Sequence, residues 1–167
     1  MSNSIVKSVI CGTALLLVSA LPAAAQGTLG AGVSFLHDTG VTAPGFAVDY
    51  SSDFQSTSRG SLGWVADFGL NHKDGNTGTT YQAGLRYNVK AGAKATVFGQ
   101  AVLGAAHSSN DFGSDTNFVV SPGVGVNIPF NDKAAFRAQV DFPIVKYDGG
   151  SDTSTRFWFG VALGLGK

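Results

Sequence analysis

An alternation with a period of two residues runs through almost the whole chain beyond residue 26, and it limits the fold more than any other feature. Large apolar side chains occupy every second position, and clusters of Gly, Asp, Asn, Ser and Thr interrupt the runs. Successive side chains of a β-strand point to opposite faces, so the pattern predicts strands that are apolar on one face. Eight such strands are expected, at residues 28–37, 45–51, 61–71, 80–90, 95–107, 117–128, 134–146 and 155–166.

The two faces of these predicted strands differ in their chemistry. One face is aromatic and branched and carries no charge, as Phe35, Trp64, Phe68, Phe159 and Leu163 illustrate. The other face is rich in Gly and in short polar side chains, whereas a soluble barrel would carry a charged exterior rich in Lys and Glu. The pattern therefore predicts an all-β fold, an eight-stranded antiparallel up-and-down transmembrane β-barrel with its apolar face towards lipid.

Charged residues are rare on the polar face, and their formal charges cancel. We expect three cations and three anions to form a polar network inside the barrel: Asp49, Asp67, Arg86, Arg137, Asp141 and Arg156. Simple hairpin registers bring Asp67 near Arg86 and Asp141 near Arg156. Eight strands enclose an interior only about wide enough for side chains to fill, so we expect a plugged barrel rather than an open channel.

The first 25 residues have the features of an export signal. Lys7 precedes an apolar run at residues 9–21, and a small-residue pattern of the Ala-x-Ala kind follows. This run is shorter than the roughly 20 residues that a transmembrane helix needs. The sequence predicts a cleaved signal peptide at residues 1–25 and one barrel domain at residues 26–167. Cys11, the single cysteine, lies inside the predicted signal, so no disulfide is expected in the barrel.

Composition and local motifs argue against several kinds of ligand. Eleven basic and eleven acidic residues give no net charge, so no nucleic-acid partner is expected. The Asp/Gly clusters at residues 111–115 and 148–152 lack the ligand register of a calcium loop, and tight turns explain them better. We expect no metal and no cofactor.

The segment SPGVGVNIPFNDKAAFRAQVDF and the ending GVALGLG resemble the bacterial outer membrane β-barrel family of small OmpA-like and OmpX-like proteins. The resemblance implies export to the cell outer membrane, contact with outer membrane lipid and recognition by the barrel-assembly machinery. Gly160, Leu163 and Leu165 match the family's terminal strand pattern and are expected to carry the assembly signal. The expected state is a monomer whose last strand closes on its first.

The leading functional hypothesis is an integral outer membrane protein with a structural or surface-interaction role and no catalysis. A narrow pore for small solutes or ions is the first alternative. A lipid A-modifying enzyme is a second, because His107, Ser109 and Asn110 resemble the serine site of barrel-type deacylases. A soluble periplasmic barrel for an apolar ligand is the last. On parity, Trp64 is expected to face lipid and Trp158 to face the interior.

Overall fold

The computed structural model describes residues 27–92, 94–110 and 113–165, so the predicted signal peptide lies outside the described residues. Ten antiparallel strand segments make up this part of the chain. They are β1 (Gly27–Asp38), β2 (Val41–Ser56), β3 (Gly60–Lys73), β4 (Asn76–Lys90), β5 (Thr96–Asn110), β6 (Gly113–Pro129), β7 (Ala134–Asp141), β8 (Ile144–Tyr147), β9 (Gly150–Thr153) and β10 (Thr155–Leu165).

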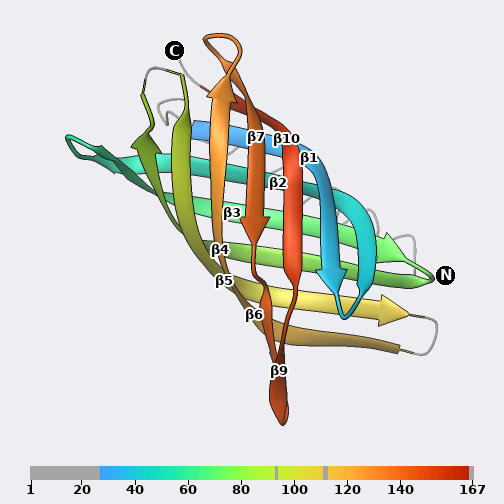
Figure 1. Ribbon diagram of the computed structural model, residues 1–167. Coiled ribbons are helices and arrows are strands. Elements are labelled where there is room, and N and C mark those ends of the chain that lie inside the picture. The colour runs from blue at the N-terminus through green and yellow to red at the C-terminus, as the bar shows by residue number, and fades with distance from the viewer. Residues whose placement is uncertain (1–26, 93, 111–112, 166–167) are drawn as a thin grey trace, which may run out of the picture.

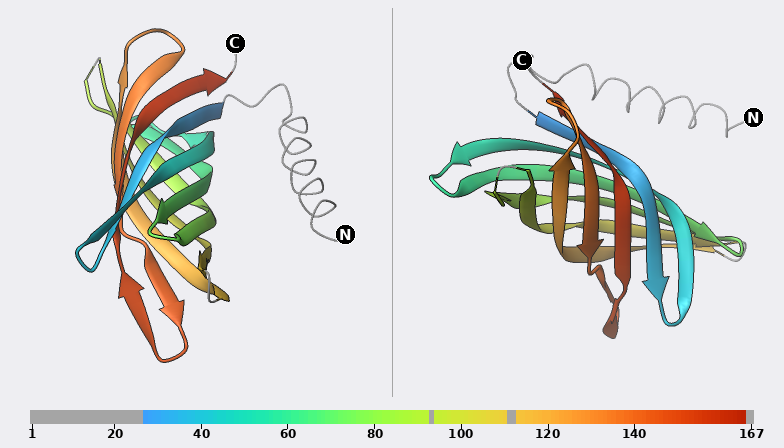
Figure 2. Two further views of the ribbon diagram at one scale, coloured as in Figure 1. Left: turned by 90° about the vertical axis from the view of Figure 1, so that its right-hand side faces the viewer. Right: turned by 45° about the horizontal axis from the view of Figure 1, so that its top comes forward.

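Eight of these strands close into a ring. The order is β5-β4-β3-β2-β1-β10-β7-β6, and β5 also pairs with β6. The views in Figures 1 and 2 show the strands wrapped around a common interior. In the closing pair, Gly27 faces Leu165 and His37 faces Thr155, so the last strand closes on the first. The predicted eight-stranded up-and-down barrel is confirmed.

Most strands are longer than the sequence pattern predicts, because the ladders continue into polar segments near the turns. β2 spans Val41–Ser56 where we expected residues 45–51, and the loops around it shrink accordingly. Two of the turns have both central residues in the left-handed region: Thr39 and Gly40 (φ 41° and 83°), and Asp74 and Gly75 (φ 50° and 77°). Such turns match the twist of the flanking strands and favour tight hairpins.

One predicted strand, residues 134–146, is interrupted. β7 ends at Asp141 and β8 begins at Ile144, on either side of Phe142 and Pro143. Proline offers no N–H to a ladder, which accounts for the break. Phe142 N still donates to Pro122 O at 2.8 Å, so the segment stays attached to β6. Beyond the break, β8 and the unpredicted β9 form a hairpin that extends past the ring.

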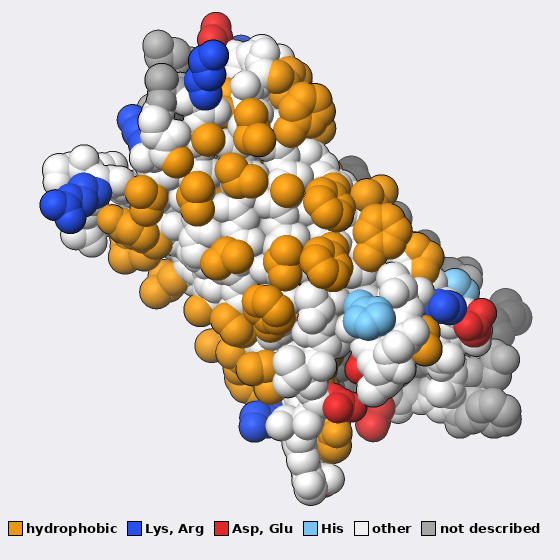
Figure 3. Space-filling view, in the orientation of Figure 1, with side chains coloured by type: hydrophobic (Ala, Val, Ile, Leu, Met, Phe, Trp, Pro, Cys, Tyr) orange, Lys and Arg blue, Asp and Glu red, His pale blue; other side chains and the backbone are white. Residues whose placement is uncertain are grey.

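The two faces of the sheet separate apolar from polar side chains. Large hydrophobic residues are exposed on the outward face of every ring strand, and Figure 3 shows them covering the middle of the visible surface, with charged side chains towards its ends. The inward face buries Arg86, Arg137, Arg156, Asp49 and Asp141, all at most 3 % exposed. Among the described residues, no helix is long and apolar enough to cross a membrane, a finding that does not bear on crossing by strands.

Candidate functional site

The charged interior divides into two clusters along the barrel axis. The described part of the chain begins and ends at one end of the ring, where Gly27 faces Leu165, and we call this the termini end. The mouth cluster comprises Asp49, Arg86 and Arg137, and its two arginines line an open cavity at the termini end. The distal cluster comprises Asp67, Asp141 and Arg156 and lies further along the interior.

In the mouth cluster, two arginines share one carboxylate. Arg137 Nη1 lies 2.5 Å and 2.6 Å from the two oxygens of Asp49, and Arg86 Nη2 donates to Oδ2 of the same group. Arg86 also donates to Ser51, and Arg137 Nε donates to Asn127 Oδ1 at 2.7 Å. Two cations and one anion leave this cluster with a formal charge of +1.

The distal cluster has the opposite ratio. Arg156 donates to both oxygens of Asp67, at 2.8 Å and 3.0 Å, in the two-pronged geometry that suits a guanidinium and a carboxylate. Its Nε donates to Asp141 Oδ2 at 3.0 Å. Gln139 Nε2 lies 2.9 Å from each Asp141 oxygen. One cation and two anions leave a formal charge of −1, so the six charges cancel over the whole interior.

A glutamine joins the two clusters into one network. Gln100 Oε1 accepts from Arg86, and Gln100 Nε2 donates to Asp141 Oδ1 at 3.1 Å. Among the described residues, Gln82 Oε1 is the one buried side-chain nitrogen or oxygen without a hydrogen-bond partner. Buried charges are tolerated when they are paired and hydrogen-bonded, and this network meets that condition.

The structure places all six predicted network residues inside the barrel, but one expected pairing was wrong. Asp67 faces Gln82 across β3 and β4 and pairs with Arg156, whereas Arg86 pairs with Asp49. A hairpin register compares only neighbouring strands, and these long side chains reach across the lumen instead. The expected approach of Asp141 to Arg156 is present, at 2.9 Å.

One aromatic ring inside the barrel, that of Phe98, was missed in the sequence analysis. The guanidinium carbon of Arg86 lies 4.4 Å from the ring centre of Phe98, and that of Arg137 lies 5.2 Å from it. Arg137 is also 5.3 Å from the Trp158 ring. Cations over aromatic faces gain electrostatic attraction when they are desolvated. Phe98 shares the parity of Gln100 on β5, which would have identified it as an interior residue.

Interior glycines leave room for the charged groups. A Cβ on Gly30 would collide with the Asp49 carboxylate and lie 2.7 Å from Arg137 Nη1. A Cβ on Gly69 would lie 2.8 Å from Arg156 Nη1, and one on Gly123 would collide with the Asp141 carboxylate. The glycine-rich face predicted from the sequence therefore accommodates the network.

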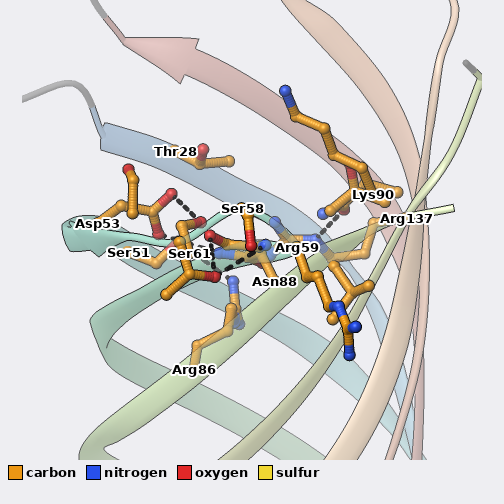
Figure 4. A pocket seen from close by; sticks show the side chains of 16 residues that line it. Thr28, Ser51, Asp53, Ser58, Arg59, Ser61, Arg86, Asn88, Lys90 and Arg137 are labelled. Carbon is orange, nitrogen blue, oxygen red and sulfur yellow. Dashed lines mark hydrogen bonds between the residues drawn. The ribbon is translucent and has the colours of Figure 1, made fainter.

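An open cavity of about 720 Å³ occupies the termini end, above the mouth cluster (Figure 4). Ser, Thr and Asn side chains form much of its wall, together with Arg59 after β2 and Lys90 at the end of β4. Asp53 lies on the opposite part of the wall, where it accepts hydrogen bonds from Ser61 and Asn88 at 2.5 Å and 3.0 Å. The sequence analysis did not identify this cavity.

The remaining candidate residues are distributed over both faces of the barrel wall. His107 Nδ1 is 2.8 Å from Thr116 Oγ1, and the other two histidines face threonines across their hairpins in the same way. Trp64 is exposed outward and Trp158 is buried inside, which confirms both parity predictions. In β10, Leu163 and Leu165 are exposed, and Gly160 faces Gly32 of β1. No group of acidic, His or Cys residues that could hold a metal occurs within the described ranges.

Solved structures with the same architecture are small outer membrane β-barrels. Neisserial surface protein A is 13 % identical, with 84 % of this chain and 96 % of that chain covered and a TM-score of 0.60. The N-terminal β-barrel domain of Pseudomonas aeruginosa OprF is 14 % identical, with 84 % and 98 % covered and a TM-score of 0.58. The outer membrane enzyme PagL is 17 % identical, with 82 % and 98 % covered and a TM-score of 0.54.

No protein-family model matches the chain, and no curated protein sequence does so either. The similarity to solved structures is therefore a similarity of fold. These neighbours include a surface protein and an enzyme, so one barrel supports more than one role. A role for this chain has to be argued from its own side chains.

Proposed function

We propose that this chain, which has the fold of small outer membrane β-barrels, is an integral outer membrane protein with a closed lumen and a structural or surface-interaction role, without catalysis. The observation that carries the proposal is the separation of the two faces. Large apolar residues such as Leu103 and Phe136 are 57 % and 59 % exposed on the outside, while the charged network is buried inside. Water would penalise so large an apolar exterior, whereas lipid would not.

Strand length and ring closure support a membrane-spanning location. A tilted strand needs about 9 to 11 residues to cross a bilayer, and β1 has 12 residues and β10 has 11. The closed ring pairs its strands on both sides, and closure removes the edges that lipid would not tolerate. On this proposal the partners are outer membrane lipid and the barrel-assembly machinery, the latter through Gly160, Leu163 and Leu165, and the protein is a monomer exported by its signal peptide.

The interior network supports the proposal of a closed lumen. The mouth and distal clusters and Gln100 cross the interior with direct hydrogen bonds between side chains. A narrow pore for small solutes or ions is the second candidate, because the cavity at the termini end already opens part of the interior to solvent. Opening a path would require the arginines of the mouth cluster to leave Asp49.

Cell fractionation combined with heat-modifiable gel mobility tests the location. We expect the protein in the outer membrane fraction and a folded band whose mobility shifts on boiling. A soluble periplasmic protein without such a shift would overturn the membrane proposal in favour of a soluble barrel.

A matched pair of substitutions on β10 tests the assignment of the faces. Leu163→Arg places a charge on the outward face, where it costs roughly 2 to 4 kcal/mol near the bilayer midplane and less near an interface. Gly164→Ser lies on the other face, where a Cβ would meet only Lys133 O at an ordinary 3.6 Å. We expect strongly reduced folded barrel for the first variant and near-normal yield for the second. Equal yields would contradict the assignment.

Epitope insertions test the orientation. Asp74 and Gly75, and Asp148 and Gly149, form the turns at the end opposite the termini. We expect insertions there to be labelled on intact cells, and an insertion at Asp132 to be labelled only after the outer membrane is opened. Labelling at Asp132 on intact cells would mean that the orientation is inverted.

A further inference from the structure

The cavity at the termini end has the size of a ligand site. Its volume of about 720 Å³ lies within the roughly 300 to 1,000 Å³ of small-molecule pockets. The arginines of the mouth cluster close its inner side, and the segment from Asp53 to Ser61 forms much of one wall. Figure 4 shows the polar and basic side chains that surround it.

Cations dominate the lining. Arg59, Lys90, Arg86 and Arg137 all border the cavity, against one acidic residue, Asp53. That carboxylate is already occupied by Ser61 and Asn88. The side chains of Arg59 and Lys90, in contrast, form no ion pair or hydrogen bond with another described residue. The wall of the cavity therefore has two cationic side chains without a partner among the described residues, and one carboxylate that already accepts hydrogen bonds.

The floor of the cavity is positively charged as well. Arg86 and Arg137 are buried and share only Asp49, so the mouth cluster contributes a formal +1 directly beneath the cavity. Cations beside a concave, partly water-excluded surface focus the field and attract anions. The cavity is thus positive from both wall and floor.

The charged surface residues at the two ends of the barrel also make the termini end the more positive one. At the termini end, the charged surface residues that the structure describes are four cations (Arg59, Lys90, Lys94 and Lys133) and two anions (Asp53 and Asp132), which gives a net charge of +2. At the opposite end they are two cations (Lys73 and Lys146) and five anions (Asp38, Asp74, Asp115, Asp148 and Asp152), a balance of −3. A diffusing anion is therefore attracted to the end at which the cavity opens.

We propose that this cavity binds a small, multiply charged oxyanion of the phosphate type, which enters from the termini end. Arg59 and Lys90 come from different elements and hold its oxygens by charge-assisted hydrogen bonds, while the hydroxyls of the wall donate further bonds. The site lies inside the ring of strands, so its ligand is a free soluble anion and not the headgroup of a lipid whose chains stay outside the barrel.

Calorimetric titration of the full chain, refolded in uncharged maltoside detergent, tests the site with inorganic pyrophosphate as the probe. We expect saturable binding by the wild type and a loss of about tenfold or more in affinity for the double variant Arg59→Gln/Lys90→Gln. Lys94→Gln is the matched control, because it removes one charge at the same end without touching the cavity lining. We expect it to change the affinity less than about twofold.

Two controls separate this proposal from its rivals. Heat-modifiable mobility of each variant reports the fold independently, so a loss of binding by a folded barrel cannot be mistaken for failure of the membrane proposal. Dihexanoyl phosphatidic acid serves as the lipid arm, and we expect it to bind no more tightly than pyrophosphate. Absence of saturable binding by the wild type, equal losses for Lys94→Gln and the double variant, or clearly tighter binding of the lipid would each overturn the inference.

Discussion

The mouth cluster and the distal cluster use the same two residue types in opposite ratios. In the first, one carboxylate serves two guanidinium groups, and in the second, one guanidinium serves two carboxylates. The arginines of the mouth cluster line the open cavity, while Asp141 of the distal cluster is fully buried. The interior is neutral as a whole but positively charged near the cavity. We therefore expect substitutions in the two clusters to change the stability of the barrel, and its dependence on pH, in different ways.

We expect the largest loss of stability for Arg156→Met, because this substitution leaves Asp67 and Asp141 without their shared cation. Breaking a buried ion pair costs about 3 to 5 kcal/mol. Urea unfolding of the refolded protein in lipid vesicles measures this loss. A proton can neutralise a carboxylate, so we expect part of the deficit relative to wild type to disappear when the pH is lowered from neutral to mildly acidic.

Asp49→Asn removes an anion instead of a cation. We expect it to lower the free energy of unfolding by about 3 kcal/mol, because two buried guanidinium groups lose their only carboxylate. Arginine does not release its proton in proteins, so acid should not restore this variant. Unfolding curves for both variants at the two pH values make the comparison. Recovery of Asp49→Asn in acid, or no recovery of Arg156→Met, would contradict the assignment of charges to the clusters.

A smaller loss, about 2 kcal/mol, is expected for Arg137→Met. Asp49 keeps Arg86 as its partner, and Arg86 keeps Ser51 and Gln100. The same urea titration ranks it against Arg156→Met. A loss as large as that of Arg156→Met would show that the mouth cluster does not share its carboxylate as described.

The smallest effect, about 1 to 2 kcal/mol, is expected for Gly30→Ala, which disturbs the mouth cluster without changing any charge. The added methyl group would press on the Asp49 carboxylate. Gly164→Ala is the control, because its methyl group would meet no atom closer than 3.6 Å. Equal stability of the two variants in urea would mean that Gly30 does not make room for the ion pair.

The sequence predicts the barrel well because alternation is a local property that each strand shows separately. The parity of Asp49 or Arg156 can be read from its neighbours, and so can the outward position of Leu163. Strand ends were predicted less well, since polar segments such as the hairpin arms of β2 continue the ladder without an apolar pattern. The break at Pro143 was also missed, although proline gave a signal for it.

The arrangement of the site could be predicted only in part. Parity identifies the charged residues that face the interior. The partner of each one depends on the path that its long side chain takes across the lumen. Arg156 reaches Asp67, 89 residues away, and Arg137 reaches Asp49, 88 residues away. The cavity at the termini end is lined in part by the end of β2, which extends beyond the strand expected at residues 45–51.

Planar-bilayer conductance of the purified barrel tests the central claim, that the two clusters together close the lumen. The account predicts at most rare, small openings for the wild type, and more frequent openings for Arg86→Ala and Arg137→Ala, which remove the mouth cluster's contacts to Asp49. A large and steady wild-type conductance would contradict it and would make the narrow pore the leading function.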